Sequence, residues 1–346
     1  MPDISQLPTL INIFIFVIGA GVITWTGSEL SVLADKLADR TGLGEALTGT
    51  VFLGFITALP GLAASVTAAL DGRPALAVSN AIGGIAIQTT FLAIADIAYT
   101  KANLEHAAAS VTNMILTAIL VTLLAIVLLG FTGPEITLGH IHPVTLVLFI
   151  AAGLGFLLAY RSSEKPMWRP RYTTETVEDI PDKNAQRENL GKLLTRFFTI
   201  SVIIILAGSL VAHTTGAIAE QTGITQTVAG GLLLALVTSL PELVTTVSAV
   251  RRGALTLAVS DVVGGNFFDV LFVFAADIFY FRGSIYHAEG VGAREYFLTA
   301  LTMLLNIILL LGLLYRQRRG PANIGFESVL MLLIYAGGFL TLIFFM

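Results

Sequence analysis

Residues 222–270 of the chain read TGITQTVAGGLLLALVTSLPELVTTVSAVRRGALTLAVSDVVGGNFFDV. Residues 41–89 read TGLGEALTGTVFLGFITALPGLAASVTAALDGRPALAVSNAIGGIAIQT and align with them without a gap, with 17 identities in 49 positions. Apolar composition alone would give some identities. It would not readily give a shared Thr-x-Leu-Pro, a shared Leu-Ala-Val-Ser and a shared Gly-Gly pair at one constant offset of 181. The chain therefore contains an internal repeat.

The repeat lies in a strongly apolar chain of 346 residues, 55% hydrophobic and 12% charged, with a mean hydropathy of +0.85. About 20 apolar residues are needed to cross the hydrocarbon core of a bilayer. Ten segments meet this need, near residues 9–34, 43–70, 75–99, 108–131, 143–161, 195–217, 223–250, 254–281, 293–315 and 325–346. The composition predicts an all-α integral membrane protein, and the net charge of −4 gives no sign of nucleic-acid binding.

One long polar stretch, residues 161–192, separates five of the apolar segments from the other five. We therefore expect two five-helix halves, 1–160 and 193–346, with the repeats 41–89 and 222–270 inside them. Placing the N-terminus outside puts 16 of the 19 lysines and arginines on the inside, as the positive-inside rule requires. This predicts a multi-pass protein of the plasma or inner membrane, with both termini outside and the central loop cytoplasmic. Because each half has an odd number of spans, the halves must be inverted relative to each other.

The repeated motifs predict two broken helices that cross close-packed partners. Pro60 and Pro241 fall inside the second and seventh spans, where a proline removes a helical hydrogen bond. Backbone groups freed at membrane depth are tolerated only where protein, water or an ion satisfies them. The Gly-Gly pairs at 83–84 and 264–265 leave room for another helix to approach closely. Two such crossings with opposite orientation predict a cation site near the membrane midplane.

Two acids are the strongest candidates for the ligands of that site. Glu242 follows Pro241 directly, and Asp269 lies 27 residues later, with Asn266 one helical turn before it. Carboxylates are rare inside membrane spans and usually functional, and oxygen ligands suit hard cations such as Ca²⁺ and Na⁺. Asp261 either reaches the same groove or marks the end of its span, and both interpretations stay open. The chain has no cysteine, so thiolate metal sites and disulfides are excluded.

At this point the sequence resembles the sodium/calcium exchanger, or cation/Ca²⁺ antiporter, family. The stretches Thr-Ser-Leu-Pro-Glu at 238–242 and Gly-Gly-Asn-Phe-Phe-Asp at 264–269 are similar to the motifs of that family's second alpha repeat. The resemblance implies two inverted five-helix repeats and alternating access, in which spans one and six slide across the remaining helices. It also implies a cation-binding set, namely Glu242, Asp269, Thr238, Ser239, Asn266, Thr57, Gln88 and the carbonyl of Ala235.

The first repeat departs from the family pattern. Gly61 stands where the family has a glutamate, Gln88 replaces a later polar ligand, and Ala58 replaces a serine. A site that has lost one carboxylate should bind Ca²⁺ less favourably, and Ca²⁺ should suffer more than Na⁺ because it carries twice the charge. The architecture is therefore better specified than the transported ion.

We expect a secondary cation antiporter, with Ca²⁺ exchanged for Na⁺ or H⁺, and no resident cofactor. A monovalent cation/proton exchanger and a transport-inactive paralogue with a structural or sensing role are the alternatives. An intramembrane aspartyl protease using Asp261 and Asp269 is disfavoured, because both acids lie on one predicted helix, so we expect no enzymatic activity. The expected partners are inorganic cations and the lipid bilayer, and the expected state is a monomer.

Overall fold

A computed structural model describes residues 6–41, 54–99, 103–108, 110–164, 166–168, 170–171, 189–253, 255–318, 320 and 324–346. Its helices are α1 (Thr9–Thr41), α3 (Leu59–Leu70), α4 (Pro74–Ala98), α5 (Leu104–Ala107), α6 (Val111–Thr132), α7 (Pro143–Glu164), α8 (Leu190–Thr222), α9 (Gln226–Val228), α10 (Ala235–Thr238), α11 (Leu240–Arg252), α12 (Leu255–Asp269), α13 (Leu271–Phe279), α14 (Ala293–Tyr315) and α15 (Phe326–Phe344). A π-helical turn, Ala229–Leu234, joins α9 to α10, and a 3₁₀ turn, Ile285–His287, follows α13.

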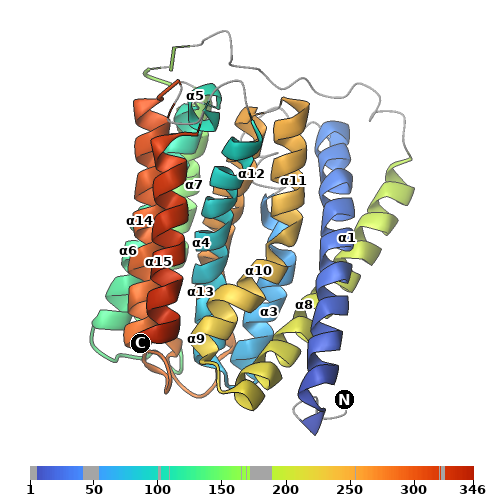
Figure 1. Ribbon diagram of the computed structural model, residues 1–346, viewed down its shortest axis with the longest axis vertical. Helices are drawn as coiled ribbons and strands as arrows, with labels where there is room; N and C mark the ends of the chain where they lie inside the picture. Colours follow the sequence, from blue (N-terminus) through green and yellow to red (C-terminus); the bar gives the residue numbers. More distant parts are fainter. Residues whose placement is uncertain are drawn as a thin grey trace.

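The helices form one bundle of roughly parallel and antiparallel rods (Figure 1). The paired α1 and α8 lie at one side of it, while α6, α14 and α15 lie at the other, with α4 and α10–α13 between them. Of the 18 most apolar consecutive residues of each candidate span, 83% are buried in α4 but only 28% in α1 and α7. α4 is therefore a central helix, whereas α1 and α7 present apolar side chains outward, as lipid-facing helices do.

The number of spans agrees with the prediction as far as the described residues reach. Among them, eight helices are long and apolar enough to cross a membrane, and the bent pair Gln226–Thr238 and Leu240–Arg251 makes nine. The predicted second span, 43–70, is described only from residue 54 onward, where it contains α3. The all-helical membrane architecture is confirmed, while the count of ten rests partly on residues 42–53, which lie outside the described residues.

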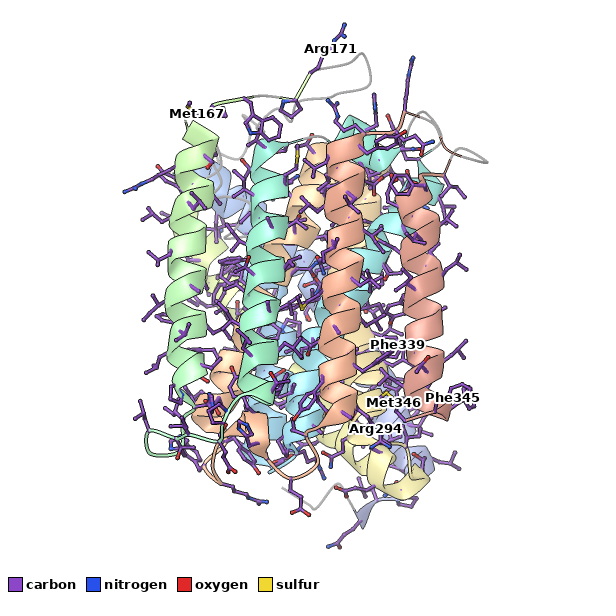
Figure 2. The ribbon with its side chains drawn as sticks, turned by 90° about the vertical axis from the view of Figure 1, so that its left-hand side faces the viewer. Met167, Arg171, Arg294, Phe339, Phe345 and Met346 are labelled. Atoms are coloured by element: carbon purple, nitrogen blue, oxygen red, sulfur yellow. The ribbon has the colours of Figure 1, made fainter. Side chains whose placement is uncertain are left out.

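The two halves run in opposite directions. Figure 2 places Met167, which follows α7, at one end of the bundle, and Met346, which follows α15, at the other end. These are the fifth predicted spans of the two halves, so the last helix of one half is antiparallel to the last helix of the other. The end of the first half and the end of the second half therefore lie on opposite sides, as an inverted repeat requires.

Matching contacts at the two ends of the bundle follow the same inversion. The carboxylate of Asp96 accepts hydrogen bonds from Leu104 N at 2.7 Å and from Gly325 N and Ser328 Oγ, both at 2.9 Å. Asp96 is thus a packing acid, because it joins the end of α4 to the beginning of α15.

The counterpart in the second half is Asp277, 181 residues later. Its carboxylate accepts from Ile285 N at 2.8 Å, His142 N at 2.8 Å and Thr145 Oγ1 at 2.5 Å, so it joins the end of α13 to the beginning of α7. Each aspartate accepts a hydrogen bond from the backbone N–H of the residue eight positions later in its own half. Each also accepts one backbone and one hydroxyl hydrogen bond from the beginning of a lipid-facing helix. The repeat therefore extends beyond residues 89 and 270.

Candidate cation site between the two helix breaks

Two helix breaks lie where the prolines predict them. The helical axis bends by 48° between Gln226–Thr238 and Leu240–Arg251, with Ser239 at the break and Pro241 in the first turn of α11. In the first half a turn at Ala58 precedes α3, whose first turn contains Pro60. A proline is compatible with the first turn of a helix because no intrahelical N–H is needed there. The predicted breaks in both repeats are confirmed.

The glycine pairs bring the two repeats into close backbone contact, also as predicted. A Cβ on Gly83 would collide with the backbone of Gly231, which precedes α10. A Cβ on Gly54 would lie 2.8 Å from the backbone of Gly264 and Gly265 on α12. Only glycine allows helices to approach this closely. The broken helix of each repeat is therefore pressed against the glycine pair of the other.

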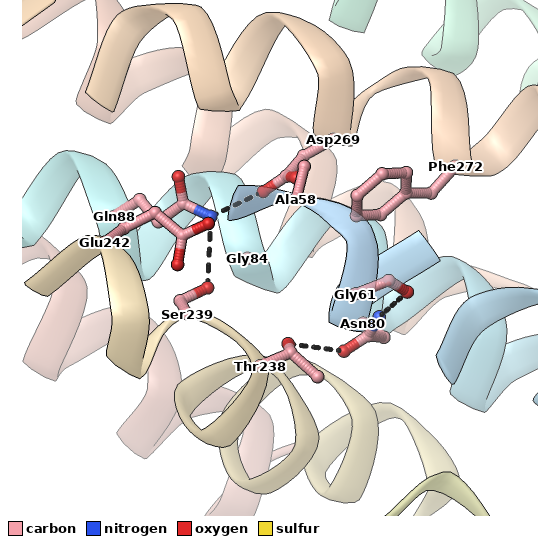
Figure 3. Close-up of a pocket in the computed structure, with 10 residues that line it drawn as sticks. All are labelled: Ala58, Gly61, Asn80, Gly84, Gln88, Thr238, Ser239, Glu242, Asp269 and Phe272. Atoms are coloured by element: carbon pink, nitrogen blue, oxygen red, sulfur yellow. Dashed lines mark hydrogen bonds between the residues drawn. The ribbon is translucent and has the colours of Figure 1, made fainter. Parts of the chain in front are cut away.

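A small cavity lies between the two breaks, shown in Figure 3. It has a volume of about 10 Å³, which is room for a single water molecule or bare cation. Its lining comes from α4, the two breaks and the junction of α12 and α13. The lining residues are Ala58, Gly61, Asn80, Gly84, Gln88, Thr238, Ser239, Glu242, Asp269 and Phe272.

Gln88 and Asp269 meet directly in the cavity wall, and they are equivalent positions of the repeat. Gln88 Nε2 donates to Asp269 Oδ2 at 2.6 Å and to Ser239 Oγ at 3.1 Å. Their neighbours Gly84 and Gly265 are equivalent too. A Cβ on Gly84 would lie 3.1 Å from Asp269 Oδ2, and a Cβ on Gly265 would lie 3.1 Å from Gln88 Oε1. The approximate two-fold axis of the repeat therefore passes between the amide and the carboxylate.

Glu242 is the second acid of the cavity. Its side chain is 1% exposed. Within the described part of the chain, neither of its carboxylate oxygens has a partner at normal hydrogen-bond geometry. Its neighbours include the hydroxyl of Thr57 and the carboxylates of Asp269 and Asp261. A buried carboxylate without a counter-charge is strongly unfavourable, so Glu242 needs a proton or a metal cation beside it.

The structure assembles most of the predicted ligand set. Five of its members line the cavity: Gln88, Thr238, Ser239, Glu242 and Asp269. Three others lie outside the lining: Thr57, Ala235 and Asn266. The Ala235 carbonyl accepts from Ser239 N at 3.1 Å and Thr238 Oγ1 at 3.3 Å, so it lies at the break. The part that each of the eight plays in cation binding stays a prediction.

Two polar side chains of α12 are not part of the cavity lining. Asn266 donates from Nδ2 to Thr89 Oγ1 at 2.9 Å, at the α4 interface. Asp261 accepts from Thr245 Oγ1 at 2.7 Å and is 3% exposed. Asp261 therefore contacts α11 and is not among the residues that line the cavity, and whether it belongs to the groove or marks the end of its span stays a prediction.

Sequence reasoning missed two lining residues, Asn80 and Phe272. Asn80 Nδ2 donates to Gly61 O at 3.1 Å, and its Oδ1 accepts from Thr238 Oγ1 at 3.4 Å, so it links the two breaks. It is the repeat equivalent of Asp261, and that equivalence was the signal that could have found it. Phe272 fills the space beside Gly61, where a Cβ would lie 2.7 Å from the ring. No sequence pattern marked it.

The donors of the cavity are carboxylates, hydroxyls and an amide, which are the ligands of hard cations. Within the described residues, no group of three or more histidine, aspartate and glutamate side chains could hold a metal ion. The cavity therefore combines two acids with neutral oxygen donors.

The chain resembles known proteins over most of its length. The family model of the sodium/calcium exchanger protein matches residues 11–161 and 192–345. The putative antiporter CaxA of Alkalimonas amylolytica is 26% identical over 328 residues, covering 94% of this chain and 96% of the relative.

Among solved structures, the H⁺/Ca²⁺ exchanger CAX superposes with a TM-score of 0.70 at 14% identity, covering 97% of this chain and 82% of that one. The sodium-calcium exchanger NCX_Mj superposes with a TM-score of 0.59 at 18% identity, covering 95% and 97%. At these identities the superpositions show a shared fold, and the family match extends over both halves. The chain belongs to the sodium/calcium exchanger family.

Proposed function

We propose that this protein is a secondary cation antiporter that exchanges Ca²⁺ for Na⁺ or H⁺ at the cavity between the two helix breaks. The observation that carries the proposal is the pairing of Glu242 and Asp269 in one small buried cavity whose other polar atoms are neutral. None of its ten lining residues is a lysine or arginine. Cations must therefore neutralise the two acids.

This charge balance favours exchange over leak. One Ca²⁺, two Na⁺ or two H⁺ would each neutralise Glu242 and Asp269. A cavity that returned empty would bury two uncompensated carboxylates, which is far less favourable than carrying a counter-ion back. The same acids therefore bind the cargo and oblige a second cation to make the return journey.

The packing of α1 and α8 supports alternating access as the transport cycle. A Cβ on Gly27 of α1 would collide with Pro241, and a Cβ on Gly208 of α8 would lie 2.5 Å from Pro60 O. Gly27 and Gly208 are equivalent at the offset of 181. In each of the two helices, therefore, a glycine packs against the helix break of the other half. Smooth glycine contacts at both breaks suit two helices that slide over the cavity and expose it to each side in turn.

A monovalent cation/proton exchanger is the second candidate, because the first half supplies the neutral Gln88 opposite Asp269. With fewer charges than a site built from acids of both halves, the cavity compensates the dehydration of Na⁺ or K⁺ better than that of Ca²⁺. A transport-inactive paralogue would show no cation flux at all. We further propose a protein of the plasma or inner membrane with both termini outside and the central loop in the cytoplasm, following the distribution of its basic residues. A monomer stays our expectation for its oligomeric state.

The test is uptake of ⁴⁵Ca²⁺ and ²²Na⁺ into vesicles reconstituted with the protein, under imposed Na⁺ and pH gradients. Calcium uptake driven by an outward Na⁺ or H⁺ gradient is expected, and Glu242→Gln and Asp269→Asn should abolish it. The matched control is Glu289→Gln, which removes an exposed acid that does not line the cavity. Flux that survives both cavity substitutions would refute the site. Na⁺/H⁺ exchange without Ca²⁺ movement would favour the second candidate.

A further inference from the structure

A second pair of buried acids lies at the end of the bundle opposite the chain termini. Glu105 belongs to α5, and Glu327 lies in the first turn of α15. Both side chains are 0% exposed, and all four carboxylate oxygens lack a partner of normal donor geometry within the described part of the chain. The two carboxyl groups are near enough to form a hydrogen bond with each other if one carries a proton. The exchange cavity includes neither of them.

The third acid of this corner is fully engaged elsewhere. Asp96 accepts three hydrogen bonds, from Leu104 N, Gly325 N and Ser328 Oγ. Asp96 therefore adds negative charge beside Glu105 and Glu327 and donates no hydrogen bond to either of them. Burial, followed by the charges of Asp96 and Glu327, raises the pKa of Glu105 well above its usual value.

The positively charged and titratable neighbours do not neutralise the pair. His106 of α5 contacts the carbonyl of Arg316 through Nδ1 at 2.8 Å. The guanidinium of Arg316, at the end of α14, donates to the carbonyls of His106 at 2.9 Å and Arg171 at 2.8 Å. α12 also packs against α5, but its Asp261 and Asp269 are engaged with Thr245 and Gln88. The charges that act on Glu105 come from the two other acids.

The other half of the molecule shows that the fold does not need acids here. By the repeat offset, Tyr286 is the equivalent of Glu105. Val144 is the equivalent of Glu327, because it lies between the two groups that Asp277 binds. Gly130 packs against both Tyr286 and Val144, as Gly312 packs against Glu327. The same corner is therefore built once with an aromatic and an aliphatic side chain and once with two acids.

We propose that Glu105 and Glu327 form a second cation-binding site, which holds one proton between their carboxyl groups and ties α5 to α15. A proton fits better than a metal ion. Ca²⁺ takes six to eight oxygens, whereas Asp96 is already occupied and a Cβ on Gly312 would lie 2.7 Å from Glu327 Cγ, so the corner is densely packed. Removal of the proton leaves two adjacent buried carboxylates that repel each other. The corner therefore loosens when the solution on this side of the membrane becomes alkaline.

The sign of the pH dependence follows from linkage. Because the pKa of Glu105 is higher in the folded than in the unfolded protein, the shared proton contributes stability at low pH, and this contribution is lost as the pH rises through the folded-state pKa. The wild-type melting temperature should therefore fall, by about 2–4 °C, relative to that of Glu105→Gln/Glu327→Gln as the pH is raised from weakly acidic to alkaline.

The direct readout is infrared spectroscopy of the full-length protein in detergent, with ¹³C-labelled glutamate. All spectra, including that of the otherwise wild-type protein, are recorded in a Glu242→Gln background, because a protonated Glu242 would give a band of its own. The wild type should show a protonated carboxyl band at neutral pH that disappears on titration to alkaline pH. Glu105→Gln and Glu327→Gln should each lack it. A wild-type spectrum without a titrating band, or a band that survives both substitutions, would overturn the proposal.

Two further variants separate this site from general packing. Glu105→Tyr/Glu327→Val copies the lining of the opposite corner and should melt without the alkaline loss. Tyr286→Phe, the matched control in that opposite corner, should keep the wild-type pH dependence. Addition of Ca²⁺ or Mg²⁺ at neutral pH should leave the band and the melting temperature unchanged. Loss of the band on adding either ion, in the wild type but not in the Gln variants, would identify a metal site and refute the shared proton.

Discussion

Replacing Asp269 by asparagine isolates the effect of charge in the cavity. The asparagine side chain has nearly the same shape, and its amide oxygen can still accept the hydrogen bond that Gln88 Nε2 donates at 2.6 Å. The neighbouring Gly84 leaves the same space on that side. The substitution therefore removes one negative charge and changes little else.

The size of the effect depends on the charge of the bound ion. A carboxylate and a unit cation about 4 Å apart interact by roughly 4 kcal/mol at an effective dielectric of 20, and Ca²⁺ gains twice as much. Dehydration offsets part of this, and breaking a buried ion pair usually costs about 3–5 kcal/mol. We take that range for Ca²⁺ and half of it for Na⁺. At about 1.4 kcal/mol per tenfold change, Ca²⁺ should lose 100-fold or more in apparent affinity and Na⁺ roughly 10- to 60-fold.

The assay is the concentration dependence of ⁴⁵Ca²⁺ and ²²Na⁺ uptake in proteoliposomes containing wild type or Asp269→Asn. Equal factors for the two ions would refute the electrostatic reasoning, because a loss of shape or folding acts on both alike. No change for either ion would remove Asp269 from the site. Melting temperatures of the two proteins, measured without added cations, check that the variant is folded.

Three further substitutions test the packing around the site. Gly61→Glu, which restores the family's glutamate, should lower the melting temperature because its Cβ meets the Phe272 ring at 2.7 Å. Adding Phe272→Ala should recover most of that loss. A single variant that melts like the wild type would contradict the close contact between residue 61 and Phe272. Gly83→Leu should cost several kcal/mol, since its side chain collides with the Gly231 backbone, and should fail to give a monodisperse protein in size-exclusion chromatography. Asp277→Ala leaves buried donors unpaired and should lower stability by about 2–5 kcal/mol, measured by thermal unfolding, while wild-type stability would show that this corner does not hold α7.

The sequence was sufficient for the backbone of the site, because proline and glycine act locally. Pro241 breaks a helix wherever it falls inside one, and Gly83 permits a close approach whatever its partner. The repeat then showed that these features occur twice with opposite orientation. Because Glu242 and Asp269 lie beside these features, their spacing in the sequence was enough to predict that the two acids share one site. Local chemistry and symmetry together therefore located the cavity.

The orientation of individual side chains depended on packing that no spacing rule fixes. Asn266 was expected on the same face as Asp269, one turn away. Positions three apart on a helix differ by about 60° around the axis, so at the tight α4 interface Asp269 meets Gln88 whereas Asn266 meets Thr89. Phe272 was missed because nothing in the sequence shows that its ring lies against Gly61.

Some of what was missed was nevertheless present in the sequence. Residues 95–107 and 276–288 share six of 13 positions at the same offset of 181, including both aspartates that hold the bundle ends. These segments lie outside the repeats 41–89 and 222–270, and it is inside those repeats that the identities are densest. The equivalence of Glu105 with Tyr286 follows from extending the same offset to them.

The backbone symmetry of this protein makes its charge asymmetry informative. In the cavity, Glu242 and Asp269 of the second half are the equivalents of Gly61 and Gln88 in the first, and both copies form the same break and the same crossing. The first half therefore forms its break and its crossing without an acid at either position, which means that the architecture does not require Glu242 or Asp269. Buried carboxylates cost stability unless a cation accompanies them. Acids that the fold can omit, and that only a cation makes tolerable, therefore support the proposal that this cavity binds cations.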